Sequence, residues 1–293
     1  MCIRDRVVVT TEVLGSVVQQ LVGDAAEVSV VMPSGANPHS YEPSARDAER
    51  MLNADVLVSN GLELEEALVS VLEAAEAEGV TWFQAAEHVN VLERDHGADH
   101  DDEAEHDDEA EHDEDDHDED HHDHGSQDPH IWTDPLAMID VVMALEPVLA
   151  EVGIDASAGA DALITDLQAL DAEVADIVSL VPEGSRQLVT GHESLGYFAD
   201  RYGFELIGTV IPGLSTSGEP TARELAQLIE ATRDSGVSVV FAEVGTPQAV
   251  AEAVASDSGA ELISLSTSQL PEDGTYQDLI RDIATTVADA LTE

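Results

Sequence analysis

The sequence predicts an α/β protein of two lobes, each a small, mainly parallel sheet flanked by helices, joined by one long linker helix. Three observations lead to this fold class. Short Val-, Ile- and Leu-rich runs alternate with amphipathic segments, an order typical of parallel sheets with right-handed crossovers. The alternation occurs twice, and a long helical pattern separates the two series. The chain has 293 residues, enough for two domains, and 43% hydrophobic residues supply their cores.

The first lobe is expected at residues 7–156. Val-rich runs predict its strands, and apolar residues at helical spacing predict its helices, with Ser44 as an N-cap and Gly79 as a stop. The expected strands are 7–11, 27–32 and 54–61, and the expected helices are 13–23, 44–53, 62–79 and 136–151. Residues 1–6 hold no apolar stretch of signal-peptide length, so we expect a non-native or truncated leader there.

The linker helix is expected at 157–182, where apolar side chains recur at steps of three and four residues and so line one face. They are Leu163, Leu167, Leu170, Val174, Ile177 and Val181. The second lobe is expected at 183–293. Its predicted strands are 186–191, 205–210, 237–244 and 261–266, and its predicted helices are 194–203, 221–236, 246–259 and one from about 275. Ligands of parallel sheets bind beyond the carboxyl ends of the strands, so a site is expected in the interlobe cleft.

The charge balance restricts the partners. The chain has 63 acidic residues against 10 basic ones, all of them Arg, and its formal net charge is −53. Such a surface attracts cations and repels nucleic acid and anionic lipid, which bind basic patches. An acidic surface without lysine is also typical of proteins adapted to high salt, and that interpretation stays open. Cys2 is the single cysteine, so no disulfide can form within the chain.

The segment 95–125 interrupts the first lobe. Its residues 95–124 include 18 acidic residues and eight histidines, and none is a large apolar residue. This composition buries too little apolar surface to offset the entropy of ordering, so we expect a disordered inserted loop. His-rich tracts bind metals, which favours auxiliary metal capture over a merely solvated tract. The histidines concerned are His96, His100, His106, His112, His117, His121, His122 and His124.

Three other histidines lie in loops next to Pro or Gly: His39 in ANPHSYEP, His130 in DPHIWTDP and His192 in TGHESLGYF. Zinc prefers imidazole and thiolate ligands, and without a usable thiolate three imidazoles are the strongest zinc set that this chain offers. The alternative is that each is a partly buried histidine with a satisfied hydrogen bond. Spacing alone does not show that the three converge.

Two further residues near these histidines have competing interpretations. Glu243 ends a predicted strand, where it could ligate a metal, orient a ligand histidine or cap the next helix. Ser194 lies two residues after His192, but the GxSxG motif of a nucleophile elbow is absent, so a helix-capping serine is expected rather than a hydrolase nucleophile.

The three blocks around these histidines resemble the signature blocks of a known family. ANPHSYEPSARDAERMLNADVLVSNGLELE, DPHIWTDP and GHESLGYFADRYGFELIG are similar to those of the metal-binding substrate-binding proteins, or solute-binding lipoproteins, of zinc and manganese ABC importers. The resemblance implies a monomeric, bilobed protein, not an enzyme, that binds one divalent metal ion in the cleft and delivers it to an ABC transporter permease. It also implies a periplasmic location, or an extracellular, membrane-anchored one.

The resemblance further implies the ligands and the metal. His39, His130 and His192 match the family's ligand histidines, and the His-rich loop together with a histidine at 192 resembles zinc importers, so Zn²⁺ is expected. Manganese-type members often place Glu at the position of His192. Many members supply a fourth ligand, an Asp, where this chain has Thr267 or Ser268, and the nearby Asp273 is out of register. Water, Glu243 or a loop histidine could fill that position.

Three alternatives remain at this point. A manganese-specific member of the same family would bind Mn²⁺ at the same site. A periplasmic zinc buffer would depend on the segment 95–125 more than on the cleft. A zinc hydrolase would use a metal-bound water as nucleophile and would need a general base and a substrate pocket, for which only Glu243 is a candidate.

Overall fold

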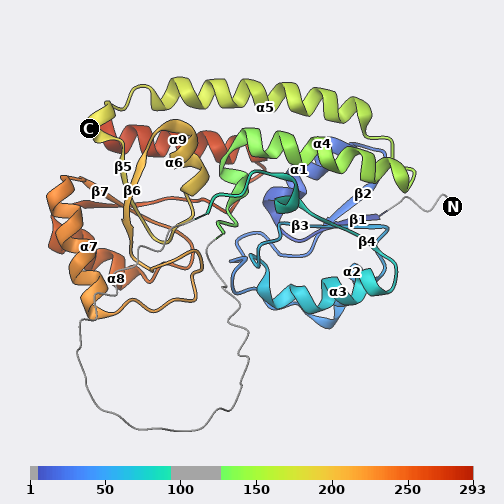
Figure 1. The fold of residues 1–293 in the computed structure, drawn as a ribbon, viewed down its shortest axis with the longest axis horizontal. Coiled ribbons are helices and arrows are strands. Elements are labelled where there is room, and N and C mark those ends of the chain that lie inside the picture. Colours follow the sequence, from blue (N-terminus) through green and yellow to red (C-terminus); the bar gives the residue numbers. More distant parts are fainter. Residues whose placement is uncertain (1–5, 94–126, 293) are drawn as a thin grey trace, which may run out of the picture.

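The structure is a computed structural model that describes residues 6–93 and 127–292. Within this part of the chain, two four-stranded parallel sheets lie side by side, one in each lobe (Figure 1). The first has the order β2-β1-β3-β4 and the second the order β6-β5-β7-β8. Their strands are β1 (Arg6–Val9), β2 (Glu27–Val30), β3 (Val56–Ser59), β4 (Thr81–Gln84), β5 (Gln187–Thr190), β6 (Glu205–Thr209), β7 (Val239–Ala242) and β8 (Glu261–Ser264). The predicted fold class of two α/β lobes is confirmed.

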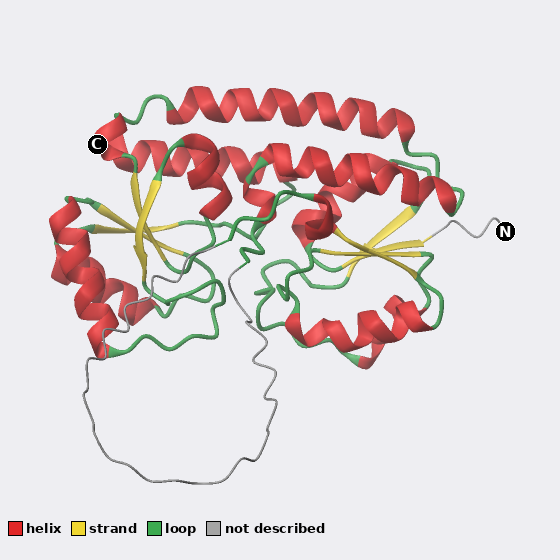
Figure 2. Cartoon of the chain, viewed as in Figure 1, coloured by secondary structure: helices red, strands yellow, loops and turns green. Residues whose placement is uncertain are grey.

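Helices cover both faces of each sheet (Figure 2). The α-helices are α1 (Glu12–Val22), α2 (Ala45–Leu52), α3 (Val69–Ala77), α4 (Pro135–Glu151), α5 (Ser157–Val178), α6 (Gly196–Tyr202), α7 (Ala222–Ser235), α8 (Gln248–Ser258) and α9 (Tyr276–Thr292). Short 3₁₀ helices are η1 (Glu66–Leu68), η2 (Ala85–His88), η3 (Ile131–Thr133) and η4 (Glu183–Ser185). None of these helices is long and apolar enough to cross a lipid bilayer.

Alternation along the strands divides the core into layers. In β1, Val7 and Val9 face one cluster of buried residues while Val8 between them faces another, as the two-residue period of a strand requires. The cluster that holds Val7 and Val9 is continuous across the molecule, since it also contains Leu188 and Phe241 of the second sheet. The two lobes therefore share one core on the side covered by α4, α5 and α9, and each has a smaller core on the opposite face of its sheet.

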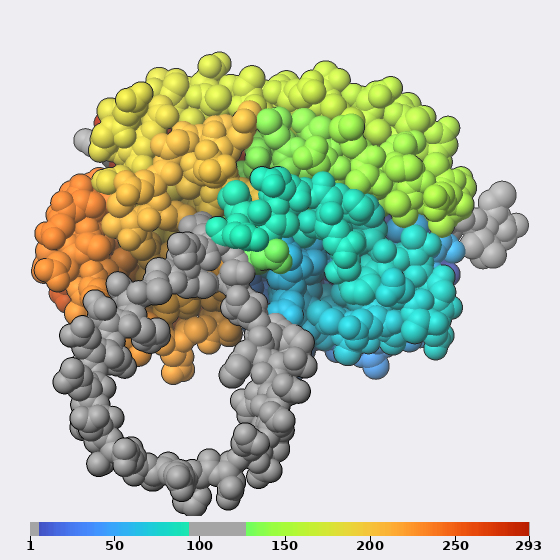
Figure 3. Space-filling view, viewed as in Figure 1, coloured from blue at the N-terminus to red at the C-terminus, as the bar shows by residue number. Residues whose placement is uncertain are grey.

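The helices that contribute to the shared core are α1, α4, α5, α6 and α9. The helix α5 packs along α4 and α9 and extends over both lobes (Figures 1 and 3). The helix α9 follows the second sheet but begins against the first lobe: the backbone N–H of Tyr276 donates to Ser16 Oγ at 2.9 Å, and its hydroxyl donates to the Trp132 carbonyl at 2.8 Å. Apolar packing and buried hydrogen bonds thus join the lobes on this side.

Element boundaries differ from expectation at a few places. The helix expected at 62–79 is shorter, because Leu62 and Glu63 have φ values of 52° and 57° and so interrupt it; η1 and α3 follow. The strand β4 was not predicted, since only Phe83 of its four residues is buried. The helix α5 covers 157–178 of the expected 157–182. The segment 95–125 with its eight histidines, and residues 1–5 of the expected leader, lie outside the described residues.

Candidate metal centre

His39 lies in the loop that follows β2. Past β2 the chain first extends the sheet, since the N–H groups of Val31 and Met32 donate to the carbonyls of Val9 and Thr10. The loop then turns, and the His39 N–H donates to Asn37 Oδ1 at 3.1 Å. Beyond the histidine, Ser44 and Asp47 form the predicted N-cap of α2, here as a reciprocal capping box. Hydrogen bonds therefore hold the loop on both sides of the imidazole.

His130 ends the buried segment that leads into η3. Its backbone N–H and its ring Nδ1 both lie within hydrogen-bond distance of Asp128 Oδ1, at 2.9 and 2.8 Å. The Asn60 side chain, from the end of β3, donates to the Pro129 carbonyl at 2.7 Å. His130 is 1% exposed. A carboxylate on Nδ1 fixes the tautomer and leaves the Nε2 lone pair for another partner.

His192 follows β5 of the second lobe, and Glu243 at the end of β7 supports it. The His192 N–H donates to Glu243 Oε2 at 3.1 Å, and its ring Nδ1 lies 2.7 Å from the same oxygen. That second contact is close in distance, but it lacks the alignment of a hydrogen bond. Gly191 permits this packing, because a Cβ there would overlap Thr246 Oγ1. Residues of its own lobe thus hold His192, with a carboxylate on its Nδ1 side, as one does for His130 in the first lobe.

The three imidazoles meet where the lobes join. His130 Nε2 lies 3.3 Å from His39 Nε2 and 3.2 Å from His192 Nε2, and one ring nitrogen of each histidine lies within 4.8 Å of the others. Two ligands of a tetrahedral zinc ion at about 2.0–2.1 Å are about 3.3–3.4 Å apart, so these separations suit one shared zinc ion. Among the described residues, no carboxylate or cysteine joins this group.

Burial favours the neutral form of two of these imidazoles. Desolvation lowers the pKa of His39 to about 2, and the nearby His130 and His192 contribute to the shift in the same direction. Desolvation also lowers the pKa of His130, while the hydrogen bond to Asp128 opposes that shift. Neutral imidazole is the form that binds metal, so no proton has to leave these two rings when a cation arrives at neutral pH.

The structure also describes the other candidate residues of the sequence analysis outside the segment 95–125. Glu243 contacts His192 and accepts a short hydrogen bond from Ser194 Oγ, but it is not part of the three-histidine group. Ser194 therefore does not cap α6, contrary to expectation; Leu195 occupies the N-cap without a side-chain bond. The Thr267 carbonyl accepts from Trp132 Nε1 at 2.7 Å. Asp273 adopts a left-handed φ of 56° before α9.

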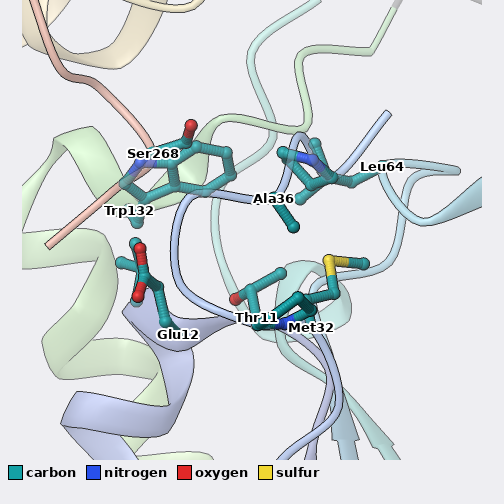
Figure 4. A pocket seen from close by; sticks show the side chains of 10 residues that line it. Thr11, Glu12, Met32, Ala36, Leu64, Trp132 and Ser268 are labelled. Atoms are coloured by element: carbon teal, nitrogen blue, oxygen red, sulfur yellow. The ribbon is translucent and has the colours of Figure 1, made fainter. Parts of the chain in front are cut away.

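A small pocket is lined in part by Trp132, whose ring centroid lies 5.3 Å from that of His130. Pro38, next to His39 in the sequence, also lines it. Figure 4 shows Trp132 in its wall. The remaining lining residues include Thr11, Glu12, Met32, Ala36, Leu64 and Ser268. Ser268, one of the two positions where the resemblance implies an Asp in many family members, thus lines a mainly apolar pocket that also contains Glu12.

Asp128 and Asn37 were not predicted as site residues. The signal for Asp128 was present in DPH, because a carboxylate two residues before a ligand histidine can reach its Nδ1. The signal for Asn37 was weaker, since an Asn two residues before a histidine is also a common turn former.

Comparison with known proteins identifies the family of the chain. The family model described as ZnuA, zinc-uptake complex component A, periplasmic, matches residues 7–290. The chain is 26% identical over 261 residues to the manganese-binding lipoprotein MntA of Halalkalibacterium halodurans, covering 88% of this chain and 77% of MntA. It is 29% identical over 253 residues to the zinc-binding lipoprotein AdcA of Streptococcus pneumoniae, covering 82% of this chain but only 45% of AdcA. The chain therefore spans less than half the length of that relative.

Solved structures show the same fold. A crystal structure of ZnuA aligns with a TM-score of 0.78 at 24% identity, over 99% of this chain and 100% of that one. The periplasmic zinc-binding protein TroA from Treponema pallidum aligns with a TM-score of 0.81 at 23% identity, with the same coverage. Because the family model spans nearly the whole chain, this protein belongs to the ZnuA family, the metal-binding solute-binding proteins of zinc and manganese ABC transporters.

Proposed function

We propose that this protein captures Zn²⁺ on the imidazoles of His39, His130 and His192 outside the cytoplasmic membrane and delivers it to an ABC transporter permease. The observation that carries the proposal is the meeting of three ring nitrogens from both lobes, with the Nε2 atoms 3.2 and 3.3 Å apart. The protein acts as a monomer, either free in a periplasm or anchored to the membrane as the lipoproteins MntA and AdcA are by name.

The ligand chemistry favours zinc over manganese. Imidazole suits zinc, whereas manganese prefers carboxylate, carbonyl and water oxygens. The carboxylates of Asp128 and Glu243 lie on the Nδ1 sides of the rings, where they orient ligands rather than bind the ion. Of the candidates for a fourth ligand, Glu243 lies outside the three-histidine group, and water is the simplest ligand to complete the tetrahedron. The relatives include both zinc- and manganese-binding proteins, so the ion has to be measured.

Release follows from the origin of the ligands. His39 and His130 belong to the first lobe and its connection, and His192 belongs to the second. A permease that displaces either lobe, or the loop that carries His39, removes at least one ligand from the ion. The remaining two imidazoles bind a divalent ion more weakly, so the ion passes to the transporter.

Titration calorimetry of the metal-free protein with Zn²⁺ and with Mn²⁺ tests the proposal. We expect one tight zinc site, much weaker manganese binding, and loss of the tight site in His130→Ala. The matched control is His88→Ala, because His88 is exposed, stacks on Phe83 and is not part of the group. Unchanged tight zinc binding in His130→Ala would refute the proposed site, and tighter binding of manganese would assign the protein to that ion.

A deletion variant that lacks residues 95–125 tests whether this segment is needed for tight zinc binding. A transporter component keeps its tight site after this deletion and loses only weak binding. Loss of all tight binding would instead favour the zinc buffer and leave the three clustered histidines with a structural role.

A further inference from the structure

The second lobe holds the loop that carries His39 at two points. Gln269 Nε2 donates to the Gly35 carbonyl at 3.0 Å, and Asn37 Nδ2 donates to Thr216 Oγ1 at 2.8 Å. Both bonds connect residues far apart in the sequence and cross from one lobe to the other. The loop is therefore attached to both lobes just before the histidine.

Asn37 differs from Gly35 because its side chain also forms a hydrogen bond with His39, a candidate metal ligand. Its Oδ1 accepts the backbone N–H of His39 at 3.1 Å, while its Nδ2 donates to Thr216. One planar amide thus joins the backbone of a metal-ligand candidate in the first lobe to a hydroxyl in the second. Movement of Thr216 away from the first lobe acts on His39 through this single side chain.

Gly245 shows how closely this contact fits. A Cβ at Gly245 would lie 2.8 Å from Asn37 Nδ2 and 2.9 Å from Thr216 Cγ2, so a larger residue would force the two side chains to shift. Gly245 lies two residues after Glu243, which contacts His192. The Asn37–Thr216 contact therefore lies between the support of His39 and the support of His192.

We infer that Asn37 is a positioning residue for metal retention: its bond to Thr216 holds His39 in place against His130 and His192, and breaking that bond speeds the release of the ion. The inference rests on the proposed function, since it requires metal binding by the three histidines. It adds that the loops after β2 and β6 control the rate of release, although neither Asn37 nor Thr216 belongs to the ligand group.

Stopped-flow transfer of zinc to an excess of a coloured chelator measures the release rate. Thr216→Val removes the hydroxyl and keeps the shape, and Thr216→Ser keeps the hydroxyl. One hydrogen bond of ordinary strength corresponds to about a 3- to 10-fold faster release from Thr216→Val. We expect release at the wild-type rate from Thr216→Ser. Release at the wild-type rate from Thr216→Val, or equal acceleration in both variants, would overturn the inference.

Two further comparisons separate positioning from general damage. Gly245→Ala should speed release, whereas Gly259→Ala should not, because Gly259 has a similar positive φ but a Cβ added there would meet no atom within 4 Å. Equal release rates in these two variants would contradict the role of the contact. Asn37→Ala combined with Thr216→Val should release no faster than Asn37→Ala alone, since both remove the same bond; additive effects would count against it.

The absorption spectrum of bound Co²⁺ supplies a readout that general unfolding would change. We expect the wild-type protein and Thr216→Val to share one spectrum, because all three imidazoles remain. A spectrum in Thr216→Val that lacks imidazole coordination would overturn the inference. Failure of the wild-type protein itself to bind zinc through His130 would instead refute the proposed function.

Discussion

The two lobes repeat one scaffold but use it differently. The strand order is the same in both sheets, β2-β1-β3-β4 in the first lobe and β6-β5-β7-β8 in the second. In each lobe, a buried Glu follows the third strand along the chain. In the first lobe, Glu65 accepts hydrogen bonds from Thr10 Oγ1 at 2.5 Å and from the Asn60 N–H at 2.8 Å. In the second lobe, Glu243 accepts from the backbone of His192 and lies against its ring.

This difference shows that loops, not the sheets, assign the chemistry. Each buried carboxylate connects the end of the third strand to the end of the first. In the first lobe, Glu65 accepts a bond from Thr10, and this contact only supports the fold. In the second lobe, Glu243 accepts a bond from His192, and this contact supports a candidate metal ligand. The loops after the second strands complete the pattern, because one carries Asn37 and His39 and the other carries Thr216. Function resides in the residues placed on the fold.

The largest expected effect is on the pH dependence of stability. The pKa of His39 is lowered to about 2 in the folded protein and that of His130 is also lowered, so below pH 6.5 the unfolded chain binds protons that the folded one does not. The metal-free protein therefore loses stability as the pH falls from 6.5, by up to about 1.4 kcal/mol per pH unit for each of these histidines.

Urea unfolding of the metal-free protein at pH 6.5 and 4.5 measures this effect. The chain has many carboxylates that also titrate, so His39→Gln is the matched comparison. We expect the stability of the variant to fall less steeply than that of the wild-type protein over this range. Parallel curves would show that the folded protein protonates His39 as readily as the unfolded chain does.

The next effect tests the two buried carboxylates against each other. Glu243→Gln should lower zinc affinity by about 10- to 100-fold, the range typical of removing a carboxylate that orients a ligand histidine. Glu65→Gln should leave zinc affinity close to that of the wild-type protein, because Glu65 supports Thr10 and Asn60 instead. Competition with a chelator of known affinity measures both. Equal losses in the two variants would contradict the difference between the lobes.

Glu65→Gln should act on stability. Burial raises the pKa of Glu65, while its carboxylate accepts bonds from Thr10 Oγ1 and from the N–H groups of Asn60 and Gly61. An amide NH₂ would face at least one of these donors, which costs about 1–3 kcal/mol in the free energy of unfolding. Chemical unfolding at neutral pH checks this value, with the exposed Glu66→Gln as control. An unchanged midpoint would mean that Glu65 is replaceable as an acceptor.

The smallest effect concerns the second attachment of the His39 loop. Gln269→Ala removes the exposed bond to the Gly35 carbonyl and should speed zinc release by no more than about 3-fold, since exposed hydrogen bonds contribute little. The same chelator-transfer experiment measures it. A larger acceleration than that of Thr216→Val would place control of the loop at Gly35 rather than at Asn37.

Most of the fold was predictable because it depends on local patterns. The Val-rich runs of β1 and β3, the spacing of Leu163, Leu167 and Leu170 in α5, and the N-cap Ser44 are each visible within a short window. The strand β4 was not predicted, because its four mostly half-buried residues show little alternation of apolar and polar side chains. The interruption before α3 was not predicted either, because no local motif indicates the left-handed backbone of Leu62 and Glu63.

The sequence by itself determined the two-lobe class, the acidic surface and the three histidine blocks, because composition and periodicity are properties of the chain alone. Only the tertiary structure decided that ring nitrogens of His39, His130 and His192 lie within 4.8 Å of one another. The first two residues are 91 positions apart in the sequence, and the last two are 62 positions apart. The tertiary structure also decided that Ser194 binds Glu243 rather than capping α6 and that Asn37 reaches Thr216. Contacts between distant segments depend on how the two sheets pack against their shared helices, and no local pattern of residues contains that information.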